Sequence, residues 1–101
     1  MLTANTASEL NKIFDANTRV VVVFSSPSWC APCRKLMPQL EIADEKLKNV
    51  TFVKVDPDDA DKELVDAWNI MSVPTMVEVE NGATVGNVKY GPAHSLISQL
   101  A

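Results

Sequence analysis

Cys30 and Cys33 are the only two cysteines of the chain, and they stand in one Cys-Ala-Pro-Cys segment. A pair at this spacing can form and break a disulfide, or it can supply two of the four ligands of a zinc ion. The zinc alternative needs two more ligands, and the sequence offers only His94 as a further soft one. We therefore favour redox chemistry and predict that no metal is bound.

The cysteine pair lies where a buried strand gives way to a helix. Val20 to Phe24 are apolar without interruption, as is typical of a central strand covered by helices on both faces. A helix beginning near Cys33 is indicated by apolar residues at helical spacing, namely Leu36, Leu40, Ala43 and Leu47. Cys30 would then sit where free N–H groups and the helix dipole favour an anion, so we expect its pKa to be depressed. Cys33, one turn further in, is close enough to attack a mixed disulfide at Cys30, and Pro32 stiffens the spacer.

The other elements are predicted from periodicity, caps and turn residues. They are a short strand at 2–4, a helix from Thr6 or Ser8 to Asn17, a strand at 50–55, a short acidic helix at 64–68, a hairpin of strands 75–80 and 85–90 around Asn81-Gly82, and a helix from Pro92 to Leu100. This order predicts an α/β fold in one domain, residues 1–101. Its core is a central mixed sheet of four to five strands with helices on both faces.

Composition restricts the partners. The chain has 101 residues, 47% of them hydrophobic, and a formal net charge of -4, so it shows no basic surface for nucleic acid. Residues 56–66 hold six carboxylates and one lysine, which makes one region acidic. The longest purely apolar run is Val20 to Phe24, and no leader is apparent. We therefore expect a cytoplasmic protein that does not bind membranes.

Several short motifs together resemble the thioredoxin family over nearly the whole chain. They are Trp29-Cys30-Ala31-Pro32-Cys33, Pro38, Val73-Pro74-Thr75 and Asn81-Gly82. The resemblance implies a thioredoxin fold and a redox-active disulfide between Cys30 and Cys33. The chain has no dinucleotide or phosphate motif, so we expect no bound cofactor, and we expect a monomer. The resemblance also implies a cis peptide bond before Pro74 facing the thiols, whereas the local sequence alone favours trans.

The resemblance implies a function in reducing disulfides of other proteins. An NADPH-dependent flavin enzyme, a thioredoxin reductase, would return the oxidised pair to the dithiol. Trp29, Val73, Gly91 and Pro92 would frame an apolar docking surface, where the backbone of Val73 pairs with an extended substrate segment. An ordinary half-buried aromatic remains the alternative for Trp29.

The sequence departs from the family at the buried acid that serves the resolving thiol. Phe24 stands where the family usually has Asp, so Lys54, which does match, lacks its usual carboxylate. Glu78 is a candidate proton acceptor, because alternation in its strand lets it flank Phe24 and pair with Lys54. The alternative, which we favour, places Glu78 near a sheet end in contact with solvent.

Other functions stay open at this point. The pair could act as a disulfide oxidase or isomerase, because direction depends on the reduction potential. The fold could serve as a binding or assembly subunit whose thiols are dispensable. Two chains could also share an iron–sulfur or zinc site.

Overall fold

The computed structural model describes the whole chain, residues 1–101. Its elements are β1 (Leu2–Thr3), α1 (Ala7–Ala16), β2 (Arg19–Phe24), α2 (Ala31–Lys46), β3 (Thr51–Val55), α3 (Lys62–Ala67), β4 (Thr75–Glu80), β5 (Ala83–Val88) and α4 (Ala93–Leu100). No helix is both long enough and apolar enough to span a membrane.

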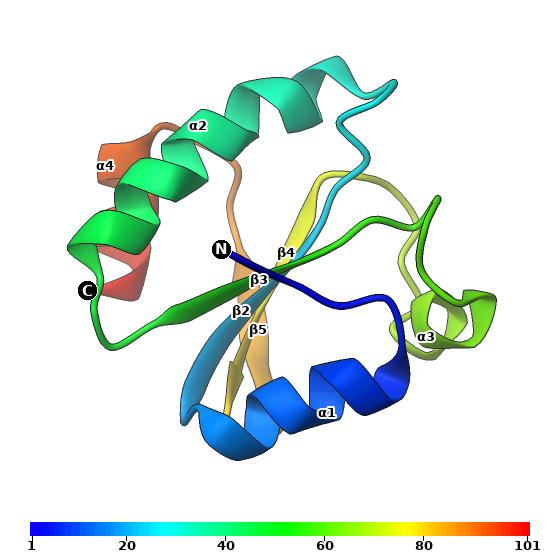
Figure 1. Cartoon of the computed structure of the whole chain (residues 1–101). Helices are drawn as coiled ribbons and strands as arrows, with labels where there is room; N and C mark the ends of the chain where they lie inside the picture. Colours follow the sequence, from blue (N-terminus) through cyan, green and yellow to red (C-terminus); the bar gives the residue numbers. More distant parts are fainter.

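The five strands form one mixed sheet in the order β1-β3-β2-β4-β5. The first three of these are parallel to one another, β4 runs antiparallel to its neighbour β2, and β5 runs antiparallel to β4. Figure 1 shows α2 and α4 on one face of the sheet and α1 and α3 on the other. The predicted α/β fold, with a mixed sheet of four to five strands between helices, is confirmed.

Strand β2 is the centre of both hydrophobic cores. Val21 and Val23 pack into the core on the side of α2 and α4, while Val20, Val22 and Phe24 pack into the core on the side of α1 and α3. Burying each such side chain is worth about 1.5–3 kcal/mol. The central strand therefore gives the active-site loop, which begins directly after Phe24, a rigid point of attachment.

The hairpin differs from its predicted bounds, because β5 is Ala83–Val88 and not residues 85–90. Asn81 and Gly82 both have positive φ, of 52° and 78°, so they form a two-residue turn from which β5 starts at once. Farther on, Glu78 pairs with Gly86 and Val79 with Thr84, which leaves Val85 in a bulge. The tight turn therefore lets β5 begin at Ala83, earlier than predicted.

The register brings three chain segments to one edge of the sheet. Phe24, the last residue of β2, pairs with Val55 at the end of β3 and with Thr75 at the start of β4. The segment after β2, the segment after β3 and the segment before β4 therefore meet there. This edge carries the cysteine pair.

Candidate active site

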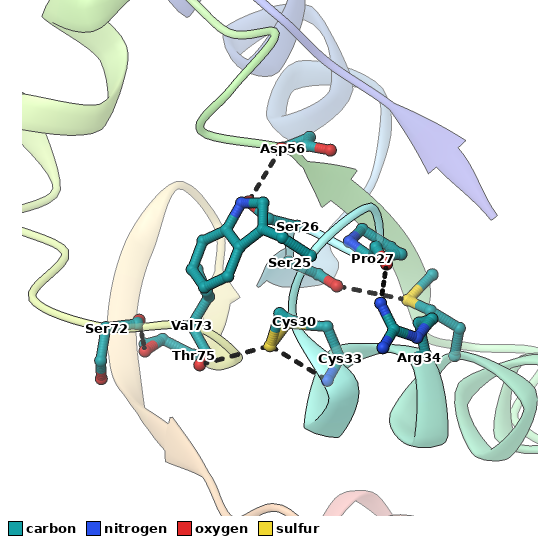
Figure 2. The surroundings of a disulfide bond; sticks show 12 residues. Ser25, Ser26, Pro27, Cys30, Cys33, Arg34, Asp56, Ser72, Val73 and Thr75 are labelled. Carbon is teal, nitrogen blue, oxygen red and sulfur yellow. Dashed lines mark hydrogen bonds between the residues drawn. A yellow bond between two sulfur atoms is a disulfide. The ribbon is translucent and has the colours of Figure 1, made fainter.

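Cys30 and Cys33 form a disulfide at the N-terminus of α2, with their Cα atoms 5.2 Å apart. Cys30 is the N-cap residue of the helix, as the sequence predicts, and its Sγ accepts the backbone N–H of Cys33 at 3.2 Å. Figure 2 shows the two side chains in this first turn. An N-cap position favours negative charge, which suits a thiolate. Pro32 fits there because the N–H groups of the first turn have no partner inside the helix.

The loop before β4 faces Cys30. The peptide bond between Val73 and Pro74 is cis, which confirms the expectation drawn from the family resemblance. The Cys30 sulfur lies 3.8 Å from the carbonyl oxygen of Val73. The hydroxyl of Thr75 donates to the carbonyl of Ser72 at 2.6 Å and closes the turn around the proline (Figure 2).

A serine and an aspartate to which the sequence analysis assigned no role form a buried hydrogen bond beside the active-site loop. The Ser26 hydroxyl donates to Oδ1 of Asp56 at 2.9 Å, and both side chains are buried (Figure 2). A signal for them was present in the sequence. Each residue follows a buried strand closely, and the carboxyl ends of parallel neighbouring strands meet at one edge of a sheet.

An open groove of about 200 Å³ lies beside Val73 and Trp29. Its apolar lining also includes Val65, Ile70 and Met71, and the Met71 side chain is 88% exposed. Trp29 is 62% exposed, so it is not an ordinary half-buried aromatic. Exposed apolar side chains gathered around a hollow are typical of a docking surface.

The groove has an acidic rim. The indole Nε1 of Trp29 donates to Oδ2 of Asp58 at 2.7 Å. Asp66 is paired with Lys62 at 2.7 Å, and this hydrogen bond and the attraction of the two charges raise the pKa of Lys62. Asp58 is in no ion pair. The rim therefore keeps uncompensated negative charge.

Gly91 and Pro92 are not among the residues that line this groove. Pro92 is the N-cap residue of α4, and a Cβ added to Gly91 would lie 3.2 Å from the hydroxyl of Ser95. The groove runs instead from Trp29 toward α3. A substrate contact at Gly91 and Pro92 stays a prediction.

Glu78 is not placed as the sequence analysis proposed. It pairs in register with Val21, and its carboxylate binds the guanidinium of Arg19 at 2.6 Å. Thr75, not Glu78, is the partner of Phe24 in β4. The prediction that Glu78 flanks Phe24 and pairs with Lys54 is therefore wrong.

The alternative, Glu78 in contact with solvent near a sheet end, is closer to what is found, since its side chain is 16% exposed. Lys54 is half-buried and lies beside Val23 in the ladder, without an ion pair. The geometry therefore does not support the hypothesis that the Glu78 carboxylate takes a proton from Cys33.

No group of three or more His, Cys, Asp or Glu side chains is arranged to hold a metal ion.

Comparison with known proteins agrees with this geometry. The family model named Thioredoxin matches residues 2–101. Thioredoxin H1 of Arabidopsis thaliana is 36% identical over 93 residues, which cover 92% of this chain and 80% of that protein. A solved structure of Plasmodium falciparum thioredoxin superimposes with a TM-score of 0.87 at 28% identity, covering 100% of both chains.

A further relative is longer than this chain. The TPR repeat-containing thioredoxin of Oryza sativa subsp. japonica is 34% identical over 104 residues, covering 100% of this chain and 32% of that protein. The chain thus spans about a third of the length of this relative.

A thioredoxin fold with a disulfide at the N-terminus of α2 defines a class of thiol–disulfide oxidoreductases. The chain belongs to the thioredoxin family. Its redox-active group is the Cys30–Cys33 disulfide, and thiol–disulfide exchange is the chemistry of the site.

Proposed function

We propose that this chain, as a single domain, reduces disulfides in other proteins, with Cys30 as the attacking thiol and Cys33 as the resolving thiol. The thiolate of Cys30 attacks one sulfur of the substrate disulfide, and the other substrate sulfur leaves as a thiolate that takes up a proton. Cys33, once deprotonated, attacks the Cys30 sulfur and releases the second substrate thiol. Two electrons pass to the substrate, and the Cys30–Cys33 disulfide is left.

The different surroundings of the two sulfur atoms support this order. Cys30 lies at the N-cap beside Val73 and keeps 5% of its surface exposed, whereas Cys33 lies inside the first helical turn with 0% exposed. The same N-cap position stabilises a thiolate on Cys30 through the N–H of Cys33. This contrast between the two cysteines is the observation that carries the proposal.

A substrate would bind as an extended segment. Its backbone would pair with Val73, and the apolar side chain next to its disulfide would enter the groove between Trp29 and Met71. Both groove residues are exposed and uncovered in the chain. Gly91 and Pro92 would touch the same segment on the other side of Val73.

The oxidised pair needs a reductant from outside the chain. We place this role with an NADPH-dependent thioredoxin reductase, which implies a reducing compartment such as the cytoplasm. The chain would act as a monomer, because a disulfide in a partner has to reach Cys30. Membranes and nucleic acids have no part in this reaction.

A coupled assay tests the function. NADPH oxidation is followed with a thioredoxin reductase, this chain and insulin as the disulfide substrate. We expect turnover that stops when Cys30→Ser replaces the wild type. The proposal would be contradicted if the wild type failed to accelerate insulin reduction both when the reductase is the electron donor and when dithiothreitol is. A biological role kept by the Cys30→Ser, Cys33→Ser double variant would favour a binding or assembly subunit.

A further inference from the structure

The hydroxyl of Ser26 and the carboxylate of Asp56 form a buried hydrogen bond that the reaction above does not use. Ser26 is fully buried and Asp56 is 8% exposed. Oδ1 of Asp56 accepts the Ser26 hydroxyl at 2.9 Å and the backbone N–H of Asp58 at 3.0 Å. Asp56 is in no ion pair, so hydrogen bonds hold its carboxylate in place.

The backbone of Ser26 extends this connection to the cysteine. Its carbonyl oxygen accepts the N–H of Cys30 at 3.0 Å and the N–H of Trp29 at 3.3 Å. Ser26 thus touches Asp56 with its side chain and Cys30 with its main chain. One residue joins the loop after β3 to the N-cap of α2.

The same two loops are joined a second time by the hydrogen bond between Trp29 and Asp58. That bond lies at an exposed tryptophan, where water competes for both groups. The bond between Ser26 and Asp56 is shielded from water, which makes it the stronger constraint. Both bonds have a carboxylate acceptor, so burial is what distinguishes them.

We propose that Ser26 and Asp56 are positioning residues that act as one unit and hold Cys30 where its sulfur can attack a disulfide. The proposal rests on the attacking role of Cys30 stated above. In this chain the buried carboxylate that contacts the active-site loop belongs to the loop after β3, while β2 itself ends in Phe24. Neither positioning residue exchanges a proton, and the Ser26 hydroxyl, although Ser26 lines the groove, is directed to Asp56.

Ser25 provides a matched control. It is also a fully buried serine of the same loop, but the partner of its hydroxyl is Sδ of Met37 at 3.6 Å, and a thioether is a weak acceptor. Ser25→Ala and Ser26→Ala therefore remove the same atom from neighbouring sites. Only Ser26→Ala removes a bond to Asp56.

The test compares single-turnover rates of the reduced variants with insulin and with a small aromatic disulfide that cannot fill the groove. We expect Ser26→Ala to react about tenfold more slowly with both substrates, since small displacements of a reacting group are costly. Ser26→Thr keeps the hydroxyl and should restore most of the rate. Ser25→Ala should stay within about twofold of the wild type.

A double-mutant cycle tests the pairing itself. Because the two residues act as one unit, Ser26→Ala combined with Asp56→Ala should be no slower than the slower single variant. If Ser26→Ala does not fold, Asp56→Asn takes its place. The Asp56→Asn variant keeps an oxygen that accepts the Ser26 hydroxyl but weakens this bond, so it should react about threefold more slowly than the wild type.

Equal rates for Ser25→Ala and Ser26→Ala would overturn the proposal, as would losses that multiply in the double variant. An Asp56→Asn variant as fast as the wild type would also overturn it. A wild type that reduces neither disulfide would instead contradict the proposed function. The two failures are thus separate results of one experiment.

Discussion

The sulfur of Cys30 lies 3.8 Å from the carbonyl oxygen of Val73, although 43 residues separate the two in the chain. The thiol and a backbone group that could accept a hydrogen bond from an incoming strand are therefore neighbours. A segment that pairs with Val73 would bring its own disulfide against Cys30. Backbone pairing at Val73 would therefore decide which disulfide of the substrate Cys30 can attack.

Replacing the resolving cysteine should trap the substrate. With Cys33→Ser, the mixed disulfide formed at Cys30 has no internal thiol to break it, so a covalent complex with a disulfide protein should accumulate. Cys30→Ser should form none. Non-reducing electrophoresis followed by mass spectrometry identifies the complex. Faster alkylation of Cys33 than of Cys30 by iodoacetamide in the reduced protein would reverse the assignment.

Charge placed in the groove should weaken docking. Met71→Asp puts a carboxylate where an apolar substrate side chain would lie, so KM for insulin should rise about fivefold while the rate with a small disulfide stays unchanged. Val85→Asp is the control, because Val85 is also exposed but lies in the bulge of β5, outside the groove. The same rise in KM for both variants would mean that the groove is not the docking site.

The order of elements and the reactive pair could be predicted from the sequence, because both are encoded locally. Val20 to Phe24 are apolar on both faces, which is enough to predict a central strand. Cys30 and Cys33 at the start of a helical pattern are enough to predict an N-cap thiol. The cis peptide bond before Pro74 could be predicted only from the family resemblance, because the local sequence favours trans.

Contacts that depend on strand register could not be predicted in the same way. Arg19 pairs with Glu80, which makes Glu78 its diagonal neighbour on the same face and explains their ion pair. The hydrogen bond between Ser26 and Asp56 likewise needs the parallel pairing of β2 and β3. Met71 joins Trp29 in the groove only through the fold of the loop before Pro74.

The acidic rim predicts a preference among substrates. Asp58 lies beside Trp29 and is in no ion pair, so a cationic side chain near the substrate disulfide should be favoured. In otherwise identical disulfide peptides, Lys in place of Glu at this point should raise the rate about fivefold at low salt, as expected for charges near a surface. The difference should shrink as salt is added.

Asp58→Asn provides the control for this preference. It removes the charge and keeps an oxygen that can accept from the Trp29 indole, so the two peptides should then react at more similar rates. Rates are measured with the reduced protein at two or more salt concentrations. A preference that is unchanged in Asp58→Asn, or that does not depend on salt, would place its origin elsewhere.

The ion pair of Glu78 should contribute to stability and not to catalysis. Its carboxylate binds Arg19, whose guanidinium also donates to the carbonyl of Leu100 at the end of α4, so the pair ties β2 and β4 to that helix. Glu78→Ala leaves the half-buried Arg19 with the Leu100 carbonyl alone. The free energy of unfolding in urea should fall by about 1–3 kcal/mol, the usual cost of losing a hydrogen bond to a charged group. The rate at which Cys33 resolves a mixed disulfide with a small thiol should be the same as in the wild type. Glu78 lies three positions along β4 from Thr75, which puts it about 10 Å farther from the cysteine edge of the sheet. Resolution that slows in Glu78→Gln, with stability kept, would restore Glu78 as a proton acceptor and contradict this assignment.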